Sequence, residues 1–176
     1  LLHQSTLIDG NLSWCGGDAI LLCIGDYVDR GPQGIECIDL VMRLQEEAVD
    51  QDGEVIALLG NHEVLLLGAY TFASNMPFHS DNVFMKAWRK NGGIERDLRS
   101  LTQAHVEWLS QLPAMVLLGD RLCLHADDMF YTTYGDSIDE VNESFQEMLE
   151  GDIQRIWLRL INEFAGRNAF SGDYEN

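Results

Sequence analysis

Two short apolar runs, each ending in glycine followed by a polar residue, constrain the fold of this chain more than any other feature. The runs are residues 19–24 and 54–59. An apolar run of this length, bounded by turn residues, is typical of a strand buried on both faces in a parallel sheet. Between the runs, apolar residues recur from Ile35 to Val49 at helical spacing. Strand, helix and strand in this order predict a parallel βαβ unit and therefore an α/β fold class.

The remainder of the chain is predicted to be mainly helical, with one further pair of strands. Residues 114–118 and 121–126 flank Gly119-Asp120, which is a tight hairpin signal. We expect residues 1–176 to form a single domain, because a domain holds ~150 residues. Helices are expected over 63–73 and after the capping residues Asp81, Thr102, Ser137 and Asp152, and residues 1–18 are expected to hold the tail of a helix followed by turns.

The charge of the chain narrows the choice of partners. Asp and Glu number 29 against 11 Lys and Arg, which gives a net charge of −18. This charge repels phosphate backbones and anionic membranes, so we expect neither a nucleic acid nor a membrane as partner, whereas metal ions and basic peptides remain compatible. The acidic residues between Leu122 and Gln154, a stretch without Lys or Arg, are interpreted as a solvated helix face, with a surface for a basic partner as the alternative.

Two further observations concern the location of the protein. No apolar run approaches the ~20 residues of a membrane span. The four cysteines include no C-x-x-C pair. We therefore expect reduced, structural cysteines and a cytoplasmic protein.

Polar residues follow three of the predicted strands. The segments are Gly25–Gly31 (GDYVDRG), Gly60–Glu63 (GNHE) and Leu124–Asp127 (LHAD). In open α/β sheets, ligand sites lie outside the carboxyl ends of the strands, so parallel strands would place Asp26 and Asn61 side by side. Asp26, Asn61 and His125 offer oxygen and nitrogen ligands, a set that suits Mn, Fe or Zn rather than a thiolate site.

The same segments contain groups suited to proton transfer and phosphate binding. His62 can donate a proton, and Asp29 can hold its imidazole in one tautomer and orientation. Arg30 presents a fork that matches the oxygens of a phosphate. Taken singly, each residue is more often a turn residue, a core histidine or a surface charge. Their combination at successive strand ends favours a functional site.

The strings GDYVDRG and GNHE resemble those of the calcineurin-like metallophosphoesterase superfamily, and most closely its phosphoprotein phosphatase branch. The resemblance implies a four-layered α/β/β/α sandwich and a site for two divalent metal ions, which can be Mn, Fe, Zn or Mg. For the metals, the resemblance implies that Asp26 bridges both ions and that Asn61 and His125 bind the second one. For proton transfer, it implies that His62, with Asp29 behind it, protonates the leaving oxygen. For the substrate phosphate, it implies contacts from Arg30 and Asn61, and Arg167 is the candidate for a second phosphate-binding arginine.

The implied activity is hydrolysis of phosphate monoesters through attack by a hydroxide that bridges the metals. The substrate would be a phosphorylated protein or a small phosphoester. The favoured interpretation is a Ser/Thr phosphoprotein phosphatase. A dinucleoside tetraphosphate hydrolase shares the same strings and is the alternative enzyme. A scaffold that keeps the fold without catalysis is the alternative outside enzymes.

The chain also departs from the family pattern. Neither the first Asp-x-His motif nor a late metal histidine occurs within residues 1–176, so we expect this chain to be a fragment truncated at both ends, weakly active or inactive alone. The third motif continues as Asp127-Asp128, where the family has glycine. We expect these carboxylates to cap the loop, and an added negative field beside the metal histidine is the alternative. For residues 71–100, a specificity insertion and a packed connection are both open.

Overall fold

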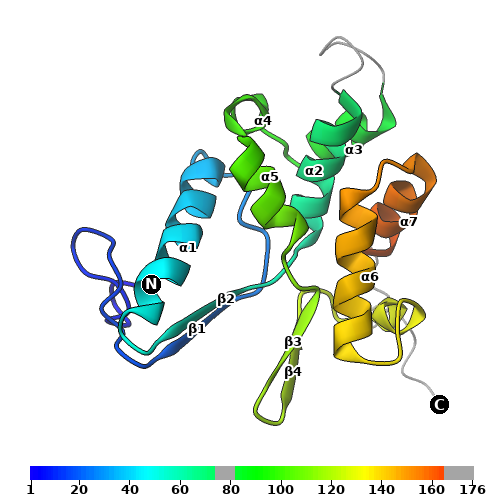
Figure 1. The fold of residues 1–176 in the computed structure, drawn as a ribbon. Coiled ribbons are helices and arrows are strands. Elements are labelled where there is room, and N and C mark those ends of the chain that lie inside the picture. Colours follow the sequence, from blue (N-terminus) through cyan, green and yellow to red (C-terminus); the bar gives the residue numbers. More distant parts are fainter. Residues whose placement is uncertain (74–81, 165–176) are drawn as a thin grey trace, which may run out of the picture.

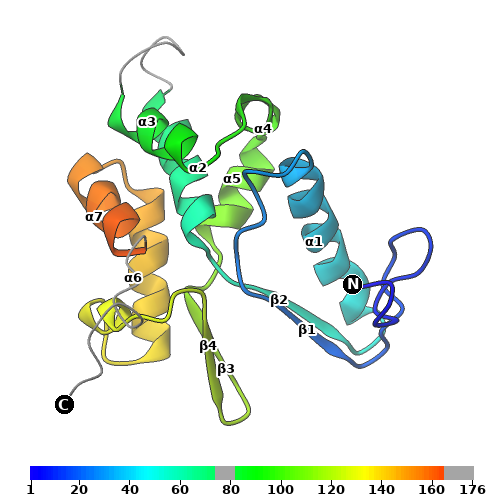
Figure 2. The ribbon, with the colours of Figure 1, turned by 180° about the vertical axis from the view of Figure 1, so that it is seen from behind.

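The computed structural model describes residues 1–73 and 82–164 (Figure 1). The elements, in chain order, are β1 (Ile20–Cys23), α1 (Gly34–Val49), β2 (Glu54–Ala57), α2 (Asn61–Ala73), α3 (Val83–Lys90), α4 (Glu95–Ser100), α5 (Gln103–Ser110), β3 (Met115–Leu118), β4 (Arg121–Leu124), the 3-10 turn η1 (Phe130–Thr133), α6 (Ile138–Glu150) and α7 (Gln154–Phe164). In Figures 1 and 2 the helices stand on one side of the strands, with α1 at one end and α6 and α7 at the other.

The predicted βαβ unit is confirmed. Strands β1 and β2 pair in parallel, with Ile20 opposite Glu54 and Cys23 opposite Ala57. Helix α1 connects them and packs one apolar face, including Ile38, against β2. Strands β3 and β4 form the predicted antiparallel hairpin. The mixed α/β fold class is therefore confirmed, with two two-stranded sheets among the described residues.

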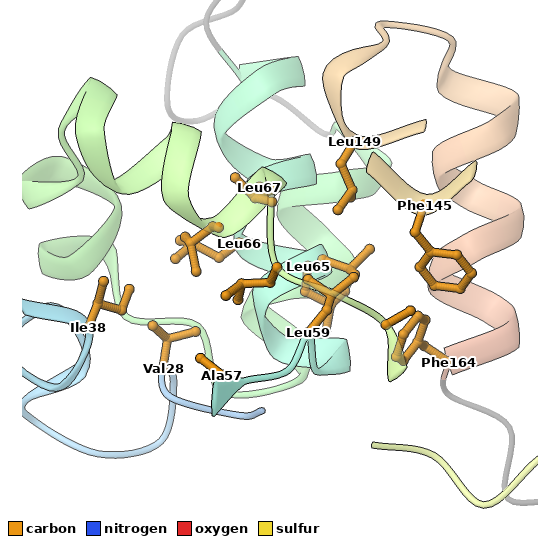
Figure 3. Packing of buried hydrophobic residues seen from close by; sticks show 14 of the residues in the cluster. Val28, Ile38, Ala57, Leu59, Leu65, Leu66, Leu67, Phe145, Leu149 and Phe164 are labelled. Atoms are coloured by element: carbon orange, nitrogen blue, oxygen red, sulfur yellow. The ribbon is translucent and has the colours of Figure 1, made fainter. Parts of the chain in front are cut away.

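Helix α2 is the centre of the packing and follows β2 directly. Its residues Val64–Leu67 are at most 3% exposed. The helix contacts α3, α5 and α7. Figure 3 shows its leucines 65–67 between Ile38 on one side and Phe145 and Phe164 on the other. Because the helix is surrounded by apolar side chains, its first turn is fixed at the end of the parallel sheet.

The helix starts test the capping predictions. Oγ1 of Thr102 accepts the N–H of His105, and Oγ of Ser137 accepts the N–H of Glu140, as predicted. The cap of α3 is Asn82, whose Oδ1 accepts the N–H of Phe84. The predicted cap at Asp81 lies outside the described residues. Within residues 1–73 and 82–164, no helix has the length and apolar character needed to cross a membrane.

The predicted helix tail at the start of the chain is wrong. Residues 1–6 form a turn, in which the N–H of Ser5 donates to the carbonyl of Leu1. Thr6 then adopts a φ of 59°, outside the right-handed helical region, and the chain continues into a bridge between Ile8 and Trp14. One hydrogen-bonded turn without a following turn does not make a stable helix.

The prediction that β1 is buried on both faces is also wrong. Ile20 is 56% exposed and Ile24 is 54% exposed. Helix α1 covers one face of the β1–β2 pair, and no helix or strand among the described residues is drawn on the other (Figure 2). Leu117 and Leu122, which pair across the hairpin, are about half exposed as well. The apolar composition of these strands indicated that they are buried, but the burial of a strand depends on which elements pack against its faces.

Candidate active site

The ends of β1 and β2 approach each other closely at two glycines. A Cβ on Gly25 would lie 2.6 Å from Cα of Gly60, and a Cβ on Gly60 would lie 2.6 Å from the backbone nitrogen of Asp26. Real side chains do not tolerate such distances, so both positions require glycine. This close approach brings Asp26, after β1, to the first turn of α2.

Glu63 fastens the two strand ends together. Its Oε2 accepts the N–H groups of Asp26 at 2.8 Å and Gly60 at 3.0 Å, and its Oε1 accepts the N–H of Tyr27 at 2.7 Å. The side chain is fully buried. Burial, with the charge of Asp26 adding to it, raises the pKa of Glu63 to about 7, and the backbone N–H groups of Asp26 and Tyr27 oppose that rise. Glu63 belongs to the motif GNHE, but the sequence analysis predicted no role for its side chain.

The loop after β1 contains strained backbone. Asp26, Asp29 and Arg30 have φ values of 62°, 67° and 57°. Residues with side chains rarely adopt this region, and each such residue costs about 1–3 kcal/mol. Strain of this kind persists only where surrounding contacts fix the chain. Thr6, Leu12 and Asp52 also have positive φ, so what distinguishes this loop is that three such residues fall within five positions at the end of β1.

His62 and Asp29 form a buried pair. Nδ1 of His62 lies 2.7 Å from Oδ2 of Asp29, and neither side chain is more than 2% exposed. The hydrogen bond with Asp29 raises the pKa of His62, the charge of Asp26 adds to this rise, and burial opposes it. Because Nδ1 is engaged, Nε2 is the nitrogen able to transfer a proton. The structure thus brings together the two residues that the sequence analysis paired.

Three predicted metal ligands also meet. Nε2 of His125 lies 3.0 Å from Oδ1 of Asn61 and 3.5 Å from Oδ1 of Asp26. Nδ1 of His125 lies 2.6 Å from the carbonyl oxygen of Ile24, which only accepts, so Nδ1 carries a proton. A neutral His125 then directs a lone pair at two further acceptors.

This arrangement of acceptors fits a cation. A bound cation relieves the repulsion among the three groups, as would a second proton on His125 or a flip of the Asn61 amide that turns its NH2 group toward Nε2. The first turn of α2 stands beside them, and the N–H of His62 donates to Oδ1 of Asp26 at 3.3 Å. Among the described residues, no group of three or more His, Cys, Asp or Glu side chains that could hold a metal occurs. The trio supplies two residues of these types, Asp26 and His125, and its third member is an amide.

The remaining predicted site residues lie as follows. The side chain of Arg30 is exposed, and its Nε–H donates to the carbonyl of Asn91 at 3.4 Å. Arg167 lies outside the described residues. Oδ1 of Asp128 accepts the N–H of Phe130 at 3.0 Å, so the expectation that Asp128 caps the loop is confirmed. Asp127 is exposed.

Two further residues at the site, besides Glu63, had no predicted role. Nε1–H of Trp88, a residue without exposed surface, donates to Oδ1 of Asp29 at 2.9 Å. The hydroxyl oxygen of Tyr131 accepts the N–H of Ala126 at 3.0 Å and so fixes the turn after His125. Trp88 was interpreted only as an apolar residue of a short helix. No local pattern signals a hydrogen bond to a residue 59 positions away.

The fold and the site together define an α/β protein with a polar site at the carboxyl ends of parallel strands, and the acceptor groups of this site fit a cation. The chain belongs to the calcineurin-like phosphoesterase family, whose model matches residues 6–172. Members of this family depend on two metal ions.

Similar proteins extend this assignment. Shewanella-like protein phosphatase 1 of Plasmodium berghei is 36% identical over 86 residues, which are 46% of this chain and 24% of that protein. Symmetrical bis(5'-nucleosyl)-tetraphosphatase of Neisseria meningitidis is 26% identical over 70% of this chain and 38% of its own length. The structure of a cold-active protein-tyrosine phosphatase of a psychrophilic Shewanella matches with a TM-score of 0.71 and 21% identity, over 98% of this chain and 53% of that one. This chain therefore spans about half or less of these proteins.

Proposed function

We propose that the full-length protein is a metal-dependent phosphoesterase that hydrolyses phosphate monoesters, and that it is a Ser/Thr phosphoprotein phosphatase. One observation carries the proposal. The buried His62–Asp29 pair stands beside the trio of Asp26, Asn61 and His125 at the ends of parallel strands. The 36% identity to a protein phosphatase over nearly half the chain supports the choice of substrate class.

The residues divide the chemistry as follows. Asp26, Asn61 and His125 would hold divalent metal ions, which would polarise the phosphoryl group and lower the pKa of a bound water. The exposed guanidinium of Arg30 binds the phosphate oxygens. His62, held through Nδ1 by Asp29, donates its proton from Nε2 to the leaving oxygen. The carboxylate of Asp29 stabilises the imidazolium that this step requires.

Metal identity and location are part of the proposal. Oxygen and nitrogen ligands favour Mn, Fe or Zn, and Mg is a further candidate. Phosphorylated proteins with basic flanking residues are the proposed substrates, since the strong negative charge of the chain attracts them. All four cysteines are free thiols, which supports a cytoplasmic location.

His62→Asn in the full-length protein tests the role of His62. We expect turnover to fall about 10²–10⁴-fold, because a general acid contributes that much, while the metal content measured by elemental analysis stays unchanged. His105→Asn is the matched control, because His105 also bonds an aspartate, Asp39 at 2.9 Å, away from the strand ends. A loss of metal in His62→Asn would show that His62 is a ligand and not the proton donor.

A substrate comparison tests the choice of phosphatase. A dinucleoside tetraphosphate hydrolase is the second candidate, because the Neisseria relative with that name matches 70% of this chain. Hydrolysis of a phosphoserine peptide without hydrolysis of diadenosine tetraphosphate supports the first candidate, and the opposite result supports the second. Metal binding without turnover of either substrate would make the protein a scaffold.

A further inference from the structure

The turn that ends α3 contacts two residues of the proposed mechanism. Nε1–H of Trp88 donates to Oδ1 of Asp29 at 2.9 Å. The backbone N–H of Arg30 donates to the carbonyl of Gly92 at 2.9 Å, and its Nε–H donates to the carbonyl of Asn91. Residues 88–92 therefore lie against the strained part of the loop after β1.

The carboxylate of Asp29 is shared between two donors. Oδ1 accepts the indole N–H of Trp88, and Oδ2 faces Nδ1 of His62. The Asp29 side chain has no exposed surface, so water cannot replace either donor. A buried carboxylate with both oxygens engaged cannot rotate without leaving one unpaired, at a cost of about 1–3 kcal/mol. Oδ2 thus stays directed at His62.

Trp88 is itself held in place. A Cβ on Gly93 would lie 2.3 Å from the indole atoms Cδ2 and Cε2, so the backbone of Gly93 lies flat against the ring. Trp88 belongs to the buried face of α3, and α3 packs on α2, which carries His62. Donor, carboxylate and histidine are therefore parts of one packed unit.

We propose that Trp88 is a positioning residue for the proton donor, acting through Asp29 on His62. This inference rests on the proposed function, because it assigns Trp88 to the step in which His62 protonates the leaving oxygen. Proton transfer depends on the orientation of the donor, and loss of a group that orients a working residue typically costs about 10–100-fold in activity.

Trp88→Phe in the full-length protein tests the proposal, because phenylalanine keeps an aromatic ring and removes the N–H. Two substrates separate proton transfer from general damage. The serine alkoxide of a phosphoserine peptide needs a proton as it leaves, whereas the phenolate of p-nitrophenyl phosphate does not. We expect kcat for the peptide to fall about 10–100-fold at unchanged KM, and kcat for p-nitrophenyl phosphate to fall less than about threefold.

Two companion variants sharpen this test. Trp88→His carries an N–H the same number of bonds from Cβ as the indole N–H, so it restores part of the activity on the peptide despite the lost ring volume. Trp157→Phe is the matched control, because Trp157 is also buried and its Nε1–H donates to the carbonyl of Gly151 at 2.8 Å. We expect Trp157→Phe to change both substrates equally.

A measurement without turnover checks the same contact. The Nδ1–H proton of His62, bonded to a buried carboxylate, should give a separate downfield proton resonance. We expect this resonance to broaden or move in Trp88→Phe and to persist in Trp157→Phe. An unchanged resonance in Trp88→Phe would overturn the proposal even if that variant lost activity.

The substrate comparison also separates the two proposals. An equal fall for both substrates in Trp88→Phe overturns the positioning role. If His62→Asn discriminates between the substrates and Trp88→Phe does not, the positioning role fails and the proposed function stands. If His62→Asn does not discriminate either, the assignment of His62 as proton donor fails, and the role of Trp88 fails with it.

Discussion

Two loops bring side chains to the candidate site, and they are held in different ways. The loop over residues 25–31 has three residues with side chains at positive φ and is fixed by Glu63 and Trp88, which are buried and distant in sequence. The loop over residues 124–131 has none at positive φ. Its backbone N–H groups are bonded by its own Tyr131 and Asp128.

The difference shows where conformational strain is tolerated. The first loop carries Asp26, Asp29 and Arg30, three groups that need separate directions within a few residues, so its backbone leaves the ordinary regions. Buried hydrogen bonds from outside the loop offset that cost. The second loop delivers His125 alone. Its backbone is held by contacts within the loop, while the His125 side chain bonds the carbonyl of Ile24. Substitutions in the contacts of the first loop should therefore cost more than those in the second.

Glu63→Gln should have the largest effect on stability. An amide keeps one acceptor oxygen and turns an NH2 group toward backbone N–H donors, so at least one buried donor loses its partner. We expect a loss of about 3 kcal/mol in the free energy of unfolding, measured with urea. Glu143→Gln is the matched control, because Glu143 is exposed on α6. A loss below about 1 kcal/mol would contradict the role given to Glu63.

Tyr131→Phe should have an intermediate effect. The variant keeps the ring, which stacks on Phe130 and Phe145, and removes the oxygen that accepts the N–H of Ala126. We expect a loss of about 1 kcal/mol in the same urea measurement, because one half-buried donor loses its partner. If Tyr131→Phe lowered the free energy of unfolding as much as Glu63→Gln does, a single contact would stabilise each loop to the same extent.

Asp128→Ala should have the smallest effect. It removes the oxygen that accepts the N–H of Phe130 at the start of η1, a turn of four residues. We expect a loss of about 0.5 kcal/mol, at the low end for lost caps, because water can reach this end of the turn. Asp127→Ala is the control and should change nothing measurable. A loss above about 2 kcal/mol would show that Asp128 does more than cap the turn.

Much of the architecture could be predicted because its signals are local. Apolar runs, helical spacing and the caps at Thr102 and Ser137 act over a few residues. The meeting of Asp26 with Asn61 followed from topology, since parallel strands end at the same edge. Even the pairing of His62 with Asp29 could be inferred, because the types of side chain needed for proton transfer are few.

The features that could not be predicted depend on contacts between residues far apart in the sequence, which no local pattern indicates. The indole of Trp88 lies in an apolar helix face, and the sequence pattern does not indicate that its N–H also donates to Asp29. Asp tolerates positive φ better than most residue types, but no local pattern indicates it at Asp26 and Asp29, and the residue type of Arg30 does not indicate it either. The exposure of Ile20 and Ile24 depends on what packs against the sheet, while composition predicts only that they can be buried.

The hydrogen bond from Nδ1 of His125 to the carbonyl of Ile24 joins residues 101 positions apart. Closing so long a loop costs entropy before the contact repays it, whereas β1, α1 and β2 pair over a short stretch of chain. During folding, Asp26 and Asn61 can therefore come together long before His125 joins them. The trio is complete only when the end of β4 has docked on the ends of β1 and β2, so cation binding by all three residues reports that docking.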